Sequence, residues 1–136
     1  MPKPAPAGLS PRIEAVLEGL TPEQRSRPNP RRDDAEAAAE GAALYAGTCA
    51  LCHGPTGLGD GPAAVVLATK ARPGNLRANA ALLTDAEHFE LIARGVPGSS
   101  MPPFAGDLSE DQLWALAAHL RASGDPRSPT PAAPPP

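Results

Sequence analysis

An apolar stripe with helical spacing is the first strong pattern along the chain. Four aliphatic side chains between residues 13 and 20 stand at positions i, i+3, i+4 and i+7, which places them on one face of an α-helix. Ser10 precedes this stripe as an N-cap residue, Pro11 suits the first turn, and Gly19 is suited to end the helix. We therefore expect a short amphipathic helix, which packs either on the rest of the chain or on a partner.

Capping signals predict three further helices. Asp33 or Asp34 caps a helix that runs to about residue 47. Capping boxes open at Thr84 and at Ser109, the first for a helix to about residue 94 and the second for a helix to about residue 123. Residues 62–69 read as a short additional helix, and Gly/Pro-rich loops lie between these elements. No segment shows strand alternation, so the pattern favours an all-α fold.

The composition predicts one folded domain with extra segments. Residues 1–32 are expected to be a Pro-rich N-terminal extension that carries the amphipathic helix, residues 33–124 the domain, and residues 125–136 a Pro-rich disordered tail. Proline is frequent, at 19 of 136 residues, whereas aromatic residues make up only 3% of the chain. So few aromatic side chains give a thin core, and a large apolar cofactor would complete it.

The charge pattern limits the kind of partner. The net charge is −3, and residues 35–123 hold the acidic excess. Such a balance argues against nucleic-acid binding, which normally requires a basic face. Lys70 is the only lysine in the domain, so a lysine-ringed docking face is not expected.

Both cysteines of the chain belong to one C-x-x-C-H pattern, formed by Cys49, Cys52 and His53. This pattern is the attachment site of c-type haem, because one helical turn presents both thiols to the same porphyrin and places the histidine over its face. A disulfide or a redox-active thiol pair fits less well, since no βαβ pattern surrounds the motif. A zinc site would need His88 or His119 as the fourth ligand, with a spacing unlike that of zinc modules.

Residues from about 35 to 123 resemble a class I cytochrome c, as found in small bacterial monohaem proteins. The features occur in the family's order: a first helix, the C-x-x-C-H motif, a glycine-rich stretch over residues 57–64, the sequence Met101-Pro102-Pro103-Phe104, and a final helix. The resemblance implies an all-α cytochrome c fold, with three to five short helices packed around one covalently bound haem.

The resemblance also implies roles for single residues. Met101 would be the second axial iron ligand opposite His53, and a thioether in that position raises the reduction potential. A proline carbonyl after the motif would hold the other nitrogen of His53, and Pro62 matches it better than Pro55. Gly41 and Tyr45 match the glycine and aromatic pair with which the family's first helix crosses the last.

The remaining polar and aromatic candidates have less specific signals. Arg72, Asn75 and Arg77 are loop residues that either reach the haem propionates or are exposed to solvent. Trp114 is expected in the core or at the haem edge. His119 stands where the family usually has an aromatic residue and is expected to pack, whereas His88 is expected on a solvated side of its helix.

The function implied is one-electron transfer by a His/Met-ligated haem c in a respiratory or photosynthetic chain, without enzyme activity of its own. Its partners would be redox proteins, such as a membrane electron-transfer complex, an oxidase, a reductase or a reaction centre. The chain would act as a free shuttle or as a tethered subunit of a larger complex. The alternative is a gas sensor or a peroxidase-like enzyme with an open sixth iron position.

Haem attachment implies a periplasmic or other extracytoplasmic location, with membrane association through a partner or an anchor. Residues 1–30 lack the apolar run of a secretory signal, and no transmembrane stretch is present. We therefore expect the sequence to be a mature form, a cloned portion or a piece of a longer exported protein.

Overall fold

The computed structural model describes residues 9–54, 61, 76, 80, 82–98 and 101–124. Within these ranges the chain forms six helices and no strands. The helices are α1 (Pro11–Glu18), α2 (Pro22–Ser26), α3 (Ala35–Thr48), α4 (Ala50–His53), α7 (Asp85–Arg94) and α8 (Glu110–Gly124). The prediction of an all-α fold is therefore confirmed.

The helix starts follow the capping rules that the sequence indicates. Ser10 accepts a hydrogen bond from the Ile13 backbone N–H, and Asp34 accepts one from Glu36. Reciprocal capping boxes open α7 at Thr84 and α8 at Ser109. These local bonds explain why the boundaries could be anticipated within a residue or two.

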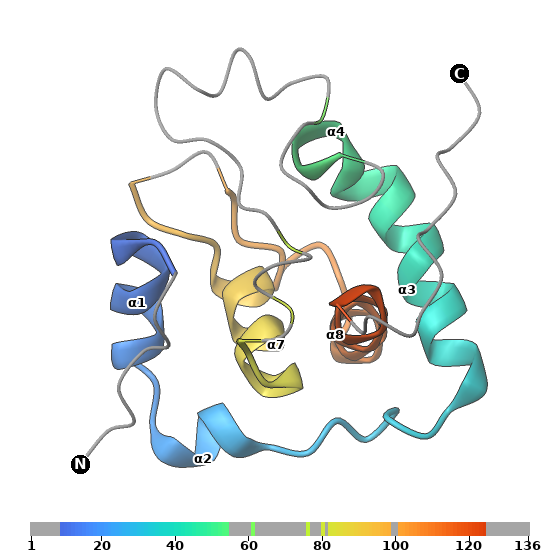
Figure 1. Ribbon diagram of the computed structural model, residues 1–136, viewed down its shortest axis with the longest axis horizontal. Coiled ribbons are helices and arrows are strands. Elements are labelled where there is room, and N and C mark those ends of the chain that lie inside the picture. The colour runs from blue at the N-terminus through green and yellow to red at the C-terminus, as the bar shows by residue number, and fades with distance from the viewer. Residues whose placement is uncertain are drawn as a thin grey trace.

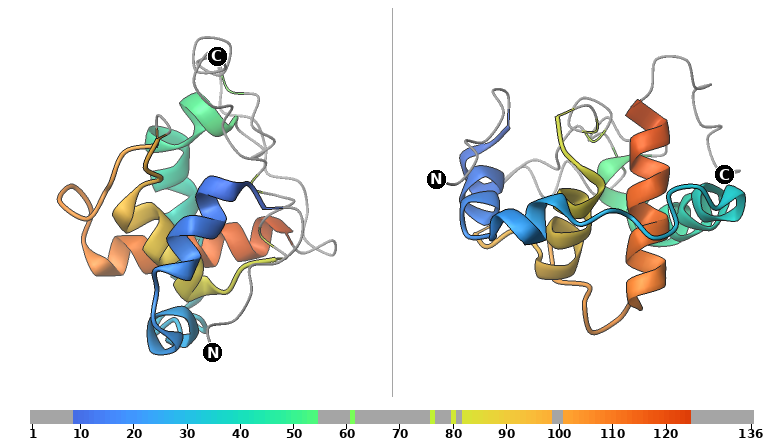
Figure 2. Two further views of the ribbon diagram at one scale, coloured as in Figure 1. Left: turned by 90° about the vertical axis from the view of Figure 1, so that its left-hand side faces the viewer. Right: turned by 90° about the horizontal axis from the view of Figure 1, so that it is seen from below.

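Helix α8 is the centre of the fold. It lies between α3 and α7, and its contact with α3 is the most extensive between any two helices that the structure describes (Figure 1; Figure 2, right). The main core forms along these helices and contains Tyr45, Phe89, Trp114 and Leu116. Cys49 packs against the same core, which connects the C-x-x-C-H motif to the body of the fold.

The N-terminal segment packs against the domain. Leu17 and Leu20 join Leu91 of α7 in a second apolar cluster, so the amphipathic face of α1 is covered by the chain's own α7. From α2 the chain runs past α7 and α8 to the start of α3 (Figure 1). We call residues 25–32 the strap, because their polar groups connect helices that are distant in sequence.

Polar contacts hold the strap in place. The buried side-chain amide of Asn29 donates hydrogen bonds to Asp85 Oδ2 and to the Trp114 carbonyl, both at 3.0 Å. The Arg27 guanidinium lies over the rings of Phe89 and Trp114, at 5.3 and 5.2 Å from their centroids. The strap thus joins α7 to α8, and Arg31 near its end forms an ion pair with Glu40 of α3 at 2.7 Å.

The expectation of a solvated His88 is wrong. Its side chain is 3% exposed, and Nε2 has no hydrogen-bonding partner among the described residues. The ring is hydrogen-bonded to the Ala80 backbone, and burial lowers the pKa of His88 to about 4 against the partly opposing charges of Asp85 and Glu87. The histidine is buried because other parts of the chain pack on several sides of α7. The polar residues in the sequence of α7 suggest instead that one side of this helix is exposed.

Buried His88 is expected to make the fold sensitive to acid. The pKa falls from 6.5 to about 4 on folding, so between these values the unfolded chain binds more protons and stability rises with pH. Acidification from about pH 6.5 to 4 should therefore remove about 3 kcal/mol from the free energy of unfolding. Denaturant titrations of the wild type and of His88→Gln over this range would check the expectation. Both proteins have the same carboxylates, so the difference between their pH profiles isolates the effect of His88. An equal pH dependence of the free energy of unfolding in the two proteins would contradict the role of His88.

Candidate haem site

The C-x-x-C-H motif forms a single helical turn that continues from α3. Cys49 ends α3 and begins α4, and its carbonyl accepts hydrogen bonds from the backbone N–H groups of Cys52 and His53, at 3.2 and 3.0 Å. Residues three and four positions apart share a face of a helix, so the two thiols and the imidazole lie along one side of this turn. The three side chains are half-buried and come from a segment of fixed conformation.

The thiols have the environment of a haem attachment site rather than that of a reactive thiol pair. Both cysteines are free, without a disulfide between them. Burial, with a smaller contribution from neighbouring Cys52, raises the pKa of the Cys49 thiol to about 11. Reactive thiol pairs depend on a lowered pKa, whereas a thioether carries no charge and suits a poorly solvated position. The residues present therefore fit covalent haem.

A zinc site does not form from these residues. Within the described ranges, no group of three or more His, Cys, Asp or Glu side chains is arranged to hold a metal ion. The His88 ring is hydrogen-bonded to the Ala80 backbone, and the His119 ring packs against the Tyr45 ring. Neither of these histidines joins the motif as the zinc alternative would need.

The motif lies at the surface of the fold. Leu51, between the two cysteines, is 62% exposed and is the one large apolar side chain that the described part of the molecule leaves exposed. Its neighbour Ala50 is buried against the core. The turn therefore has an inner side toward the helices and an outer side open to a partner.

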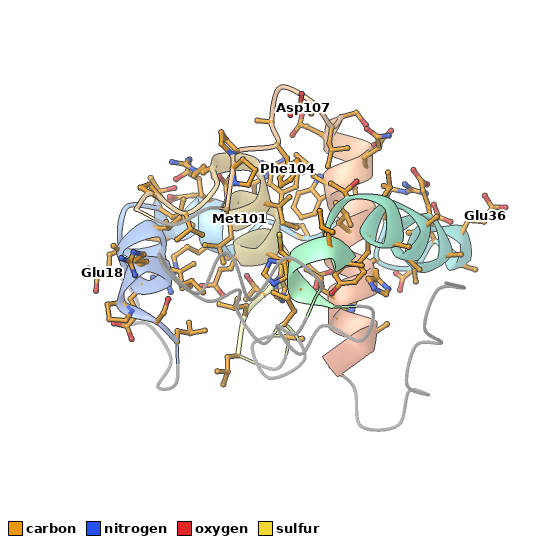
Figure 3. The ribbon with its side chains drawn as sticks, turned by 90° about the horizontal axis from the view of Figure 1, so that it is seen from above. Glu18, Glu36, Met101, Phe104 and Asp107 are labelled. Carbon is orange, nitrogen blue, oxygen red and sulfur yellow. The ribbon has the colours of Figure 1, made fainter. Side chains whose placement is uncertain are left out.

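Met101 lies in the loop between α7 and α8, half-buried and on the side of the molecule where α4 lies (Figure 3). The loop is tied to α7 by backbone hydrogen bonds from Phe104 to Ile92 and from Ala105 to Ala93, at 3.1 and 3.2 Å. Figure 3 shows Phe104 pointing toward the helices and Asp107 at the tip of the loop. The Met101 carbonyl itself accepts a hydrogen bond from the Val96 N–H at 3.2 Å, so the backbone of this methionine is held by the segment that follows α7.

Gly95 gives the Met101 loop room to pass. Its φ of +72° favours glycine, and a Cβ there would lie 2.7 Å from the nitrogen of Pro103 and 2.9 Å from the carbonyl oxygen of Met101. The sequence predicts only that the helix ends at about residue 94, next to Gly95. Gly95 also lets the backbone of residues 101–103 pass close to it. This close approach is a contact between backbones, so the glycine itself is its only sign in the sequence.

The pair Gly41 and Tyr45 stands at the crossing of α3 and α8, as the resemblance implies. A Cβ on Gly41 would lie 2.8 Å from the Cβ of His119 and closer still to the Ala115 carbonyl. One turn later, the Tyr45 ring packs on the His119 ring with centroids 5.2 Å apart. His119 is 9% exposed, and burial lowers its pKa, as expected for a packing residue.

The other candidates are only partly covered by the structure. Trp114 is 2% exposed and stacks on Phe89 with centroids 4.3 Å apart, which places it in the core. Its contact with haem stays a prediction. Gly61 lies against α4, donating a hydrogen bond to the Cys52 carbonyl at 3.1 Å. The following candidates lie outside the described residues: Pro55, Pro62, Arg72, Asn75 and Arg77.

The helical fold and the single C-x-x-C-H turn define a monohaem class I cytochrome c. Residues 36–120 match the family model described as cytochrome c oxidase, cbb3-type, subunit III, and the chain belongs to this family. Haem c is therefore its cofactor, and haem-based electron transfer is the activity that the family supports. No helix in the described ranges is both long enough and apolar enough to cross a membrane.

Three solved structures that share the fold are two c-type cytochromes and one chain of a reducing HAO-like protein complex. A chain of the Kuenenia stuttgartiensis reducing HAO-like protein complex is 24% identical with a TM-score of 0.57, over 65% of this chain and 44% of that one. Cytochrome cL of Methylophaga aminisulfidivorans is 23% identical with a TM-score of 0.53, over 85% and 70%. The c-type cytochrome KustC0563 is 28% identical with a TM-score of 0.50, over 61% and 95%.

The lengths of these relatives differ from that of this chain. The match spans less than half of the HAO-like complex chain but nearly all of the c-type cytochrome KustC0563. A comparison with curated proteins finds no match.

Proposed function

We propose that this protein carries single electrons between redox partners through a haem c held by Cys49 and Cys52 and ligated by His53 and Met101. The observation that carries the proposal is the paired construction of the site. A fixed helical turn presents two thiols and a histidine, and a separate loop, tied to α7 and seated on Gly95, presents the one methionine of the domain.

Each residue has a defined task in this proposal. The thiols of Cys49 and Cys52 bind the cofactor permanently, so that it stays in place while partners exchange. His53 supplies an imidazole nitrogen, and Met101 supplies a soft thioether that favours the reduced form of the iron. Bound haem supplies the one-electron chemistry, and the surrounding core excludes water from it.

The outer side of the motif is the proposed docking face, since exposed Leu51 lies there. The partners would be a quinol-oxidising complex, a dehydrogenase or a photosynthetic reaction centre as donor, and an oxidase or reductase as acceptor. The protein would act as a free shuttle or as a subunit of a larger redox assembly, and a chain of an HAO-like protein complex with the same fold is an example of the second arrangement. We place the protein in the periplasm or another extracytoplasmic space and assign it no catalytic activity of its own.

Met101→Ala tests the ligand assignment. Loss of the thioether should abolish the weak far-red absorption band that sulfur–iron charge transfer gives the ferric protein. It should also lower the reduction potential by about 0.1–0.3 V, within the ~0.8 V range that axial ligands span. Spectra and a redox titration of the haem-loaded full chain would measure both, together with carbon monoxide binding to the reduced form.

Pro102→Ala is the matched control, because Pro102 is exposed and lies in the same loop. This variant should keep the band and exclude carbon monoxide. A wild-type protein that lacks the band and binds carbon monoxide would contradict the proposal. That result would support the open-iron alternative, a gas sensor or a peroxidase-like enzyme.

A further inference from the structure

Tyr45 touches the C-x-x-C-H motif at both of its ends. Its backbone carbonyl accepts a hydrogen bond from the Cys49 N–H at 2.8 Å, just where the motif begins. Its side-chain hydroxyl donates a hydrogen bond of 2.6 Å to the carbonyl of Gly54, the residue that follows His53. One residue of α3 therefore spans the whole turn that carries the haem ligands.

Gly54 needs this support because of its conformation and burial. It ends α4 with φ 84° and ψ 159°, and its N–H donates to the Ala50 carbonyl at 2.9 Å. Helix α4 has only four residues, and a helix of that length has no stability without contacts from outside. The Tyr45 hydroxyl satisfies the carbonyl of a buried residue, so Gly54 is held on both of its peptide groups.

The position of the Tyr45 ring is in turn fixed by α8. The ring is 4% exposed and belongs to the main core, and the His119 ring packs on it at a tilt of 52°. The close approach of α8 at Gly41, one turn earlier, brings His119 to this place. The hydroxyl therefore reaches Gly54 from a rigid support rather than from a mobile side chain.

We propose that Tyr45 is a positioning residue for His53: through its hydroxyl it holds Gly54, the residue after the motif, and so sets the orientation of the imidazole toward the haem iron and adjusts the reduction potential. The proposal rests on the function proposed above, in which His53 is an axial ligand. Tyr45 itself touches neither substrate nor iron in this scheme, and it acts through Gly54.

Tyr45→Phe in the haem-loaded full chain is the first test, because it removes the hydroxyl and keeps the ring. We expect the variant to retain covalent haem and to have a shifted reduction potential. We also expect the chemical shifts of the haem methyl protons in the ferric protein to cover a different range. The resonances of these protons report the orientation of both axial ligands, and Met101 is the same in the variant and the wild type. The control is Thr84→Val, which removes another hydroxyl-to-carbonyl bond, from Thr84 to Arg25 at 2.8 Å, in a different part of the fold. This control should lower stability and leave both readouts unchanged.

A second test does not depend on the Phe variant folding. Tyr45 is the one tyrosine of the chain, so growth on 3-fluorotyrosine modifies this position alone. Fluorination makes the hydroxyl a stronger hydrogen-bond donor, and the potential should then move in the direction opposite to that of Tyr45→Phe.

The outcomes separate the two proposals. Potentials and methyl resonances equal to those of the wild type in both the Phe and the fluorotyrosine proteins would overturn the positioning role and leave Tyr45 as a packing residue. A wild type without the ferric sulfur band would contradict Met101 ligation, whereas the methyl resonances would still report on His53 and Tyr45.

Discussion

Gly41→Ala is expected to destabilise the protein, although alanine is the better helix former. Within a helix, the substitution alone would add up to about 1 kcal/mol of stability. At this crossing, however, the new methyl group would meet the Ala115 backbone and lie 2.8 Å from the Cβ of His119. Separating α3 from α8 to admit it should cost about 1–3 kcal/mol beyond the propensity gain, because packed helix backbones cannot give way as a flexible side chain can.

Gly47→Ala is the matched control on the same helix. A Cβ at Gly47 meets nothing within 4 Å, so that variant should gain stability from helix propensity. Thermal or denaturant unfolding of the two haem-loaded variants would measure the difference. If both variants were stabilised alike, the close approach of α3 and α8 would be wrong.

Glu87→Gln is expected to be among the most damaging single substitutions away from the haem motif. The Glu87 carboxylate accepts a hydrogen bond from Arg25 Nε at 2.9 Å and one from the Thr84 N–H at 2.8 Å. The side chains of Arg25 and Glu87 are 5% and 1% exposed. Neutralising one member of a buried pair leaves the other charge without compensation, and the expected loss is about 3–5 kcal/mol. That is a large part of the stability of an ordinary domain.

Glu110→Gln provides the contrast, since Glu110 pairs with Arg27 at 3.5 Å and both side chains are well exposed, at 72% and 45%. This variant should change the free energy of unfolding by less than about 1 kcal/mol. The double variant Arg25→Met/Glu87→Met should recover part of the loss, because neither charge remains buried. Equal unfolding midpoints for Glu87→Gln and Glu110→Gln would show that the buried pair does not hold α2 against α7.

Local rules made the helices and the haem motif predictable. Thr84 and Ser109 cap their helices through bonds three residues apart, and Cys49, Cys52 and His53 lie within one turn. Such features depend on neighbours in sequence, so the chain itself displays them. Gly41 and Tyr45 required the family resemblance in addition, because their partners belong to α8.

Contacts between polar residues that are distant in the sequence could not be predicted from the sequence alone. Residues 27–32 have the composition of a linker, yet Asn29 bonds to α7 and to α8 from a buried position. His88 belongs to the polar residues of α7 and is nevertheless buried, since α7 is packed on several sides. No hydrophobic period marks such positions, because the partners of these residues are single carboxylates and carbonyls far along the chain.

The pairing of α3 with α8 has a consequence for the order of events during biogenesis. A ribosome or an export channel delivers the chain from its N-terminus, so the two cysteines emerge well before the helix that completes the core around them. Contacts between segments so distant in sequence are slow to form, because the long loop between them must close first. A haem-attachment enzyme that acts before α8 packs on α3 would therefore meet the motif on a chain whose core is incomplete. The time at which α8 packs on α3 would then set how long the thiols stay accessible to such an enzyme.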